Sequence, residues 1–344
     1  MDLFELTRAL VDIESVTNNE AAAGEFLFRH ISPLAAKYGG RVERMEVEAQ
    51  RFNLFASWGK PVVTMSTHMD TVPPFFPSRE DDTYLWGRGA CDAKGIIAAM
   101  ISAAEKLLAE GVSDLGLLFV VGEERNSAGA RVAAETPRGS RYLINGEPTE
   151  NKLCVASKGA LRFEVTAKGS LAHSGYPELG SSAIYTLLDV LNDVRRLPLP
   201  EDSLLGKSTL NIGTISGGRA PNVVADEARA EIMFRLVGDA APVRAAVHKA
   251  VAGRVEVREV LHTPVFHFSA LDGLPTTVVA FTTDVPTLHE TWGTPFLIGP
   301  GSIRVAHTAE ERIAKQELRD AVEIYASMVK RLLASNAEAQ GTLR

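Results

Sequence analysis

The chain has 344 residues, which exceeds the usual size of a single domain, so two domains are expected. Hydrophobic residues make up 45% and charged residues 23%, proportions that are ordinary for a globular protein. The net charge is −7, whereas phosphate binding requires an excess of basic residues on the surface. The charge therefore argues against nucleic acid as a bulk partner.

The cysteines and the N-terminal segment indicate a cytoplasmic protein. With only Cys91 and Cys154 present, neither a disulfide framework nor a Cys-x-x-Cys zinc site is predicted, and a reducing compartment fits. The N-terminus lacks the basic and apolar regions of a signal peptide. No apolar run reaches the roughly 18 residues that a membrane helix needs, so no membrane is expected among the partners.

Strands and helices alternate in the first part of the chain. Apolar residues at helical spacing, stop signals and short apolar runs predict helices over 3–13, 20–38 and 95–110, and strands over 53–58, 62–66, 115–121 and 142–144. Asp2 and Glu5 resemble a capping box at the start of the first helix. This alternation predicts an α/β domain with a parallel or mixed sheet covered on both faces.

The pattern changes near Lys158. Alternating strands are predicted over 161–167, 209–215, 228–237 and 254–260, with helices over 182–195 and 240–251. Their order, β-α-β-β-α-β, is that of a ferredoxin-like domain. Strands over 277–282 and 296–298 and a helix over 308–333 then return to the α/β pattern. We therefore predict a domain 158–267 inserted into a larger domain formed by 1–157 and 268–344.

Histidines and carboxylates cluster near predicted strand ends. They are His68, Asp92, the pair Glu123-Glu124, Glu147 and His307. In open α/β sheets the strand ends are where sites gather. Imidazole and carboxylate ligands without a thiolate suit zinc, cobalt or manganese, and two ions fit if one carboxylate bridges them.

Each of these residues also has an ordinary interpretation. A lone histidine at a strand end is usually structural, Asp92 could cap the following helix, and an acidic doublet is usually a solvated loop. Asp70, two residues after His68, could orient its imidazole ring. A dinucleotide-binding turn is rejected, because the segment 87–92 lacks the third glycine of Gly-x-Gly-x-x-Gly.

Five motifs that occur in order favour the functional interpretation of these residues over the ordinary one. They are Thr67-His68-Met69-Asp70-Thr71-Val72-Pro73, Gly87-Arg88-Gly89-Ala90-Cys91-Asp92-Ala93-Lys94-Gly95, Glu123-Glu124, Gly146-Glu147-Pro148 and Ala306-His307-Thr308. Together they strongly resemble the zinc metallopeptidase family of acetylornithine deacetylase, succinyl-diaminopimelate desuccinylase and the glutamate-releasing carboxypeptidases. The resemblance covers nearly the whole chain. It implies a mixed-sheet catalytic domain with an inserted ferredoxin-like α+β lid and dimerisation domain.

The resemblance assigns a role to each residue of the cluster. His68 and Glu147 would bind one zinc ion, Glu124 and His307 the other, and Asp92 would bridge the two; Co²⁺ or Mn²⁺ could replace Zn²⁺. Asp70 would orient His68. Glu123 would be the general base that takes a proton from the attacking water and delivers it to the leaving amine. A cis peptide is expected after Asp92.

Further roles are implied for the inserted domain and one loop. His173 would stabilise the oxyanion from the partner subunit, and Asn222 with Arg235 would hold the substrate carboxylate. Gly301 would form part of a backbone wall near the substrate. His173 could instead be an ordinary loop residue, and Arg235 an outward residue in a salt bridge. Arg304 could add positive charge near the substrate or point to solvent.

The expected function is hydrolysis of an amide bond in a small N-acyl amino acid or short peptide. Acetylornithine deacetylase-like activity is the first expectation. The alternatives are a desuccinylase, a dipeptidase or carboxypeptidase, and a carrier-protein-releasing lysine hydrolase. A non-catalytic binding protein on the same scaffold is disfavoured, because such a protein has little need to keep Glu123. A homodimer through the inserted domain is expected from the resemblance alone.

Overall fold

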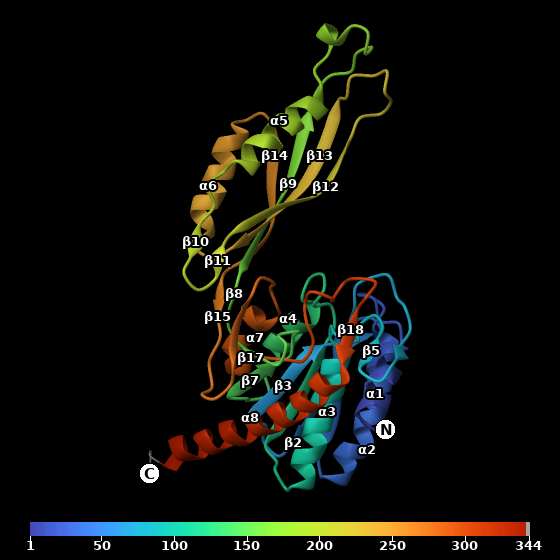
Figure 1. Ribbon diagram of the computed structural model, residues 1–344, viewed down its shortest axis with the longest axis vertical. Helices are drawn as coiled ribbons and strands as arrows, with labels where there is room; N and C mark the ends of the chain where they lie inside the picture. Colours follow the sequence, from blue (N-terminus) through green and yellow to red (C-terminus); the bar gives the residue numbers. More distant parts are fainter. Residues whose placement is uncertain (342–344) are drawn as a thin grey trace. The chain divides into compact units, whose positions relative to one another are not determined.

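A computed structural model describes residues 1–341 of the chain, and internal contacts divide it into two units (Figure 1). The first unit comprises residues 1–155, 268–277 and the chain from Thr283 on. The second comprises residues 156–267 and 278–282. None of the helices in the described part combines the length and apolar character needed to cross a membrane.

A mixed sheet has its centre in the first unit, and a few of its residues (156–157, 266–267 and 278–279) belong to the second. Within the described residues it has nine strands, in the order β1-β2-β6-β3-β7-β17-β8-β15, with β16 paired to β8. The strands are β1 (Arg41–Glu48), β2 (Arg51–Trp58), β3 (Val63–His68), β6 (Leu115–Val120), β7 (Tyr142–Asn145), β8 (Leu153–Ser157), β15 (Phe266–His267), β16 (Thr276–Val279) and β17 (Thr294–Leu297). The central run β6-β3-β7-β17 is parallel, whereas β1, β2, β8 and β15 pair antiparallel. The predicted mixed α/β sheet is therefore confirmed.

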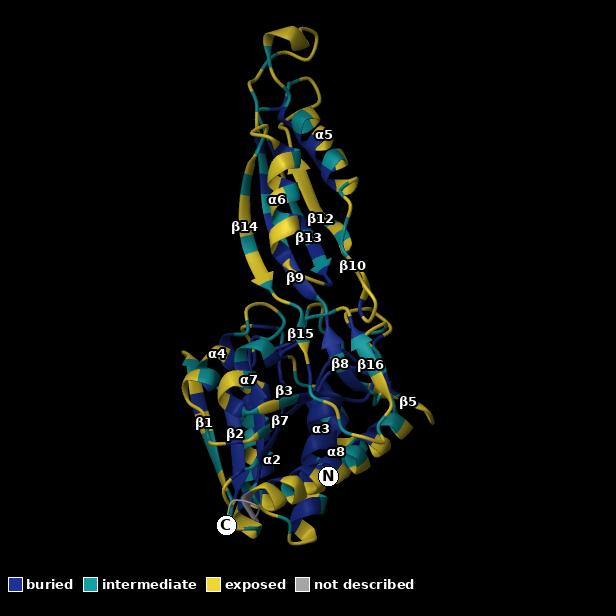
Figure 2. Cartoon of the chain, turned by 90° about the vertical axis from the view of Figure 1, so that its left-hand side faces the viewer, coloured by how far each residue is buried: buried dark blue, intermediate teal, exposed yellow. Residues whose placement is uncertain are grey.

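Helices cover both faces of this sheet because its strands are apolar on both sides. In β6, Leu117 and Phe119 belong to one core cluster, while Leu118 and Val120 belong to another on the opposite face. The first core is closed by α1 (Leu3–Val11), α2 (Ala21–Lys37), α3 (Lys94–Ala109) and α8 (Lys315–Gly341), and the second by α4 (Ala128–Glu135) and α7 (Val285–Trp292). Figure 2 shows α3 and the central strands as almost wholly buried.

The parallel strands β3, β6 and β7 determine where the polar residues meet. His68 pairs with Val120 in the β3–β6 register, and Ser66 pairs with Asn145 in the β3–β7 register. Parallel strands end at the same edge of a sheet, so the segments that follow them lie side by side. A separate three-stranded sheet, β18-β5-β4, is formed by β4 (Arg79–Glu80), β5 (Tyr84–Trp86) and β18 (Arg312–Ala314).

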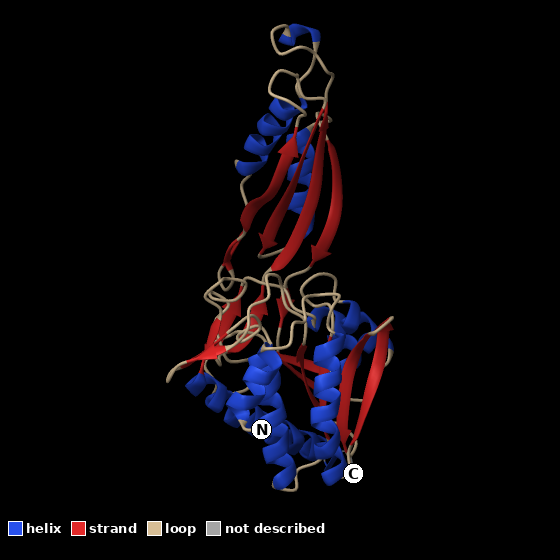
Figure 3. Cartoon of the chain, turned by 90° about the vertical axis from the view of Figure 1, so that its right-hand side faces the viewer, coloured by secondary structure: helices blue, strands red, loops and turns tan. Residues whose placement is uncertain are grey.

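The second unit has the ferredoxin-like order that the sequence predicts. Its antiparallel sheet runs β12-β13-β9-β14, and two helices, α5 and α6, pack on one face (Figure 3). Its elements are β9 (Gly159–Lys168), the 3₁₀ turn η1 (Pro177–Leu179), α5 (Ala183–Arg195), β10 (Glu201–Asp202), β11 (Gly206–Lys207), β12 (Thr209–Gly217), β13 (Glu227–Leu236), α6 (Ala240–Val251) and β14 (Glu256–Thr263). Along β9, Leu161, Phe163 and Val165 are buried while the alternate residues are partly exposed, as expected for a sheet covered on one side.

The structure corrects several predicted boundaries. The last helix was expected over 308–333 but begins at Lys315, because the preceding residues pair with β5 as β18. Pairing between distant segments overrides local helical periodicity there. The strand expected over 62–66 extends to His68, so this histidine ends the strand rather than following it. The predictions also omitted β1, β8, α4 and α7.

Candidate metal centre

His68, the last residue of β3, is held by contacts on both nitrogens of its ring. Its Nε2 lies 2.9 Å from Oδ1 of Asp92, and its Nδ1 lies 3.0 Å from the backbone carbonyl of Asp70. The side chain is only 1% exposed. Contact with a carbonyl oxygen requires a proton on Nδ1, so Nε2, which faces Asp92, has the lone pair that a metal ligand needs.

Asp92 lies between two imidazole rings. It belongs to the loop before α3, whose N-cap is Ala93 and has no side-chain cap, so the carboxylate of Asp92 is not used for capping. Its Oδ1 faces His68, and its Oδ2 lies 3.4 Å from Nε2 of His307. The Asp92–Ala93 peptide is cis, as the resemblance implies. A carboxylate that offers one oxygen to each side has the arrangement that a bridging ligand requires.

His307 and Glu124 complete the opposite side of the cluster. Nε2 of His307 lies 2.9 Å from Oε1 of Glu124. His307 has a φ of 64°, a left-handed conformation that is uncommon outside glycine and concentrates at functional sites. Its side chain is 46% exposed, against 7% for Glu124, so the cluster opens to solvent at His307.

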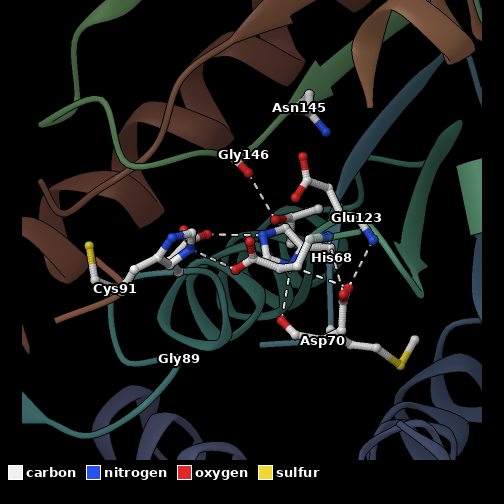
Figure 4. A network of polar contacts seen from close by, with 12 residues as sticks. His68, Asp70, Gly89, Cys91, Glu123, Asn145 and Gly146 are labelled. Carbon is white, nitrogen blue, oxygen red and sulfur yellow. Dashed lines mark hydrogen bonds and ion pairs between the residues drawn. The ribbon is translucent and has the colours of Figure 1, made fainter. Parts of the chain in front are cut away.

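The carboxylate of Asp70 ties three segments together beneath His68 (Figure 4). Its Oδ1 accepts the backbone N–H of Glu123 at 3.1 Å, and its Oδ2 accepts the N–H of Glu124 at 3.2 Å and the hydroxyl of Thr17 at 2.7 Å. Nδ1 of His68 is 3.5 Å from Oδ1, farther than from the Asp70 carbonyl. The carboxylate therefore holds the two glutamates at least as directly as it holds the histidine.

Glu147 is buried beside β3 and carries an unsatisfied oxygen. Gly146 separates Glu147 from the end of β7, and the N–H of Gly146 donates to the carbonyl of Ser66 in β3. Oε1 of Glu147 has no hydrogen-bond partner among the described residues, and at 4% exposure the residue has little access to water. A buried carboxylate oxygen without a partner is costly, and a cation is the partner that removes this cost.

The donor set of the cluster fits divalent metal ions. Ligand atoms of His68, Asp92 and Glu124 lie within 4.8 Å of one another, so these three side chains could hold an ion. Two imidazoles and several carboxylates without a thiolate suit zinc, cobalt or manganese. Glu147, with its unpartnered oxygen, and His307, next to Asp92, are placed to add to the set.

Proton affinities in the cluster reflect crowded negative charge. Burial, followed by the neighbouring Glu147 carboxylate, raises the pKa of Glu123 well above its ordinary value. Hydrogen bonding to Asp92 and Glu124 raises the pKa of His307 to about 10. Burial disfavours ionisation of Asp92, but His307 and His68 outweigh this effect and hold its pKa below the usual range. The raised pKa values show that the buried carboxylates of the cluster favour nearby positive charge. Bound metal ions would supply that charge in place of protons.

A family model places the chain among known enzymes. The model of peptidase family M20/M25/M40 matches residues 64–331. The chain belongs to this family. It is therefore a hydrolase of the M20 peptidase type, acting on peptide bonds, and the suspected zinc metallopeptidase resemblance is confirmed.

Known relatives of this M20 peptidase align with nearly the whole of its chain. A peptidase M20 domain-containing protein of Schizosaccharomyces pombe is 38% identical over 95% of this chain and 84% of its own length. A probable carboxypeptidase of Aspergillus flavus is 38% identical over 95% of this chain and 86% of its own. A Staphylococcus aureus tripeptidase structure has a TM-score of 0.79 at 21% identity, covering 96% of this chain and 98% of its own. A Sulfolobus solfataricus M20 family metallo-carboxypeptidase has a TM-score of 0.77 at 16% identity, covering 96% and 99%. The two structures show a shared fold.

Three further residues predicted for the site of this M20 peptidase, His173, Asn222 and Arg235, belong to the second unit. His173 is exposed, its segment bridges to Val223, and the N–H of Ser174 donates to the carbonyl of Asn222 at 3.0 Å. The structure thus brings the His173 and Asn222 segments together within the second unit. Arg235, in β13 of that unit, is half-buried, and burial lowers its pKa.

Gly301 lies in the first unit with a φ of 87°. A Cβ added there would approach Sγ of Cys91 to 2.6 Å, so glycine is required where this loop passes the Asp92 segment. Two residues that contact the cluster, Thr17 and Glu311, were missed by the sequence analysis. Thr17 lies 50 residues before the first motif and Glu311 three residues after the last, and no spacing signal points to either of them.

Proposed function

We propose that this M20 peptidase is a two-metal hydrolase that releases a C-terminal amino acid from a short peptide or from a small N-acyl amino acid. Asp92 carries this proposal, because its two carboxylate oxygens face the imidazoles of His68 and His307. Glu124 and Glu147 would complete the two sites, with zinc, cobalt or manganese as the ions. Relatives that are 38% identical are named probable carboxypeptidases, which supports an exopeptidase.

Carboxypeptidase and N-acyl amino acid hydrolase activities share one chemical group. In both substrates the scissile amide nitrogen is attached to a carbon that carries a free carboxylate. The half-buried guanidinium of Arg235 makes no hydrogen bond or ion pair within residues 1–341, so it is available for such a carboxylate. Acetylornithine deacetylase-like activity is one case of this class, and desuccinylase, dipeptidase and carrier-protein-releasing activities are others.

The residues of the chain divide the work of hydrolysis. Bound divalent ions supply Lewis acidity, which polarises a carbonyl group and makes water more acidic. Glu123, whose backbone N–H is held by Asp70, would accept a proton from the attacking water as a C–O bond forms. It would return that proton to the amine nitrogen as the C–N bond breaks. His173 would donate a hydrogen bond to the oxyanion.

Dimerisation through the second unit and a cytoplasmic location belong to the same proposal. Exposed apolar side chains gather on the helix α5 and the segment before it, with Leu179 74% and Tyr185 72% exposed. Such a surface is typical of an interface between subunits. The low cysteine content supports the location.

A substrate panel tests the proposed activity. Metal-stripped protein would be assayed on N-acetyl, N-succinyl and dipeptide substrates, with and without Zn²⁺, Co²⁺ or Mn²⁺. Each substrate would be paired with its C-terminal amide, which lacks the carboxylate. We expect metal-dependent turnover of one class and at least a tenfold loss of kcat/KM for the paired amide. Equal turnover of acid and amide would reject recognition of the carboxylate, and no turnover with metal bound would reject the proposed substrate class.

A further inference from the structure

A buried carboxylate outside the proposed ligand set holds the loop that carries Asp92. Oε1 of Glu311 accepts backbone N–H groups from Gly89 at 2.9 Å, from Cys91 at 3.3 Å and from Asp92 at 3.2 Å. Glu311 is 1% exposed. Three donors from a stretch of four residues therefore converge on one oxygen, which fixes the backbone that presents the Asp92 carboxylate.

The second oxygen of Glu311 is paired with a buried cation from the same loop. Oε2 accepts a hydrogen bond from Nη1 of Arg88, whose side chain is 2% exposed. The Arg88 guanidinium also donates to the carbonyl of Pro74 at 3.2 Å and lies 5.0 Å from the centre of the Phe76 ring. The positive charge of Arg88 thus balances the negative charge of Glu311 inside the protein, without solvation by bulk water.

The backbone of Glu311 makes a further contact with the loop. Its carbonyl accepts the N–H of Gly87 at 3.1 Å. Glu311 follows His307 by four residues, and both ends of this short segment contact the loop that carries Asp92. One end places His307 3.4 Å from Asp92, and the other clamps the backbone of residues 87–92. Glu311 therefore connects the segments of two residues that we assign to the metal centre, more than two hundred residues apart in sequence.

We propose that Glu311 is a positioning residue of the metal centre, which fixes the spacing of Asp92 and His307 by clamping the loop 87–92. This inference rests on the proposed function, in which these two residues bind metal. Glu311 acts through the backbone of the loop and touches neither substrate nor metal. Residues that orient metal ligands typically change metal affinity by about 10–100-fold when they are replaced.

Two replacements of Glu311 separate the contributions of the clamp. Glu311→Gln keeps an oxygen that can accept the N–H groups but removes the charge that pairs with Arg88. Glu311→Ala removes every side-chain contact. We expect Co²⁺ affinity to fall by about tenfold in Glu311→Gln and by about 100-fold in Glu311→Ala. Arg88→Met leaves the three N–H contacts in place, and we expect it to bind Co²⁺ more tightly than Glu311→Ala.

A control variant distinguishes positioning from general loss of stability. Leu107 is fully buried at the far end of α3, about 20 Å along the helix from Lys94 at 1.5 Å per residue. Leu107→Ala leaves a cavity that destabilises the same unit without touching the loop. We expect it to lower the unfolding temperature while Co²⁺ affinity stays within about twofold of the parent protein.

The measurement is a Co²⁺ titration of metal-free full-length protein, followed by visible absorption and by competition with a chelator, with folding checked by circular dichroism. Weaker Co²⁺ binding in the order Leu107→Ala, Glu311→Gln, Glu311→Ala, with a changed absorption spectrum in the Glu311 variants, supports the inference. Unchanged binding in both Glu311 variants overturns it, and so does an equal loss in Leu107→Ala. Failure of the parent protein to bind Co²⁺ would instead reject the proposed function, so the two failures are distinguishable.

Discussion

The hydroxyl of Thr17 donates to Oδ2 of Asp70 at 2.7 Å, which connects the segment between α1 and α2 with the candidate metal centre. Asp70 in turn accepts the N–H groups of Glu123 and Glu124. Thr17 is therefore two contacts away from the proposed general base and lies in none of the sequence motifs. Thr17 is 9% exposed, so water does not readily replace its hydroxyl group.

Replacing Thr17 by valine tests this connection, because valine keeps the shape and removes the donor. A buried acceptor that loses a partner costs about 1–3 kcal/mol. Asp70 keeps two N–H donors, so we expect the lower end of that range and a fall in kcat/KM of about tenfold. Stability would be measured by urea unfolding and turnover on the best substrate of the panel.

Thr7→Val is the matched control for Thr17→Val. Thr7 is also buried, but its hydroxyl donates to the carbonyl of Leu3 within α1, away from the cluster. We expect Thr7→Val to leave kcat/KM unchanged. Equal losses of activity in the two variants would show that Thr17 has no particular link with Asp70.

The proposed base is tested by Glu123→Gln. Glutamine has the same shape and leaves the backbone N–H contact with Asp70 in place, but it cannot accept the proton of the attacking water. General-base action typically contributes at least 100-fold, so kcat should fall by two orders of magnitude or more. Metal content would be measured in parallel and should be unchanged. Turnover close to that of the parent protein would exclude the proton-transfer role.

Sequence patterns predicted the cluster because parallel strands bring distant segments to one edge. The segments before Glu123 and His68 were predicted as strands of a parallel or mixed sheet, and β3 and β6 are paired in parallel. Thr17 and Glu311 could not be found this way. Their roles depend on which backbone N–H groups face them after folding, and periodicity carries no information about such contacts. Residues 312–314 were wrongly predicted as helix for the same reason, since β5, with which they pair, lies far away in sequence.

A role for His173 in the neighbouring subunit has a distinctive test. If His173 serves the active site of a partner, His173→Ala should slow turnover by about 100-fold, the lower range for losing one oxyanion donor. Mixing this variant with Glu123→Gln should restore part of the activity, because a mixed dimer contains one site with an intact base and an intact histidine. A mixture of Glu123→Gln and His307→Ala is the control, since both changes lie in the same centre.

Complementation of the two variants would be measured after co-refolding, with dimer formation checked by sedimentation. Restored activity in the first mixture and none in the control would support action between subunits. No restoration in a confirmed mixed dimer would place the role of His173 within its own chain.

Metal removal should lower both activity and stability. Any ligand that binds only the folded protein stabilises it by RT ln(1 + [L]/Kd), about 2.7 kcal/mol when the ion is at 100 times its Kd. Chelation should therefore abolish turnover and lower the unfolding temperature, and Zn²⁺, Co²⁺ or Mn²⁺ should restore both. Glu147→Ala should bind fewer ions, because the unpartnered Oε1 is then lost. Glu110→Gln, an exposed acid paired with Lys330, should behave as the parent protein. An unfolding temperature that is unaffected by chelation, in protein shown to have lost its metal, would contradict a metal centre built from these buried carboxylates.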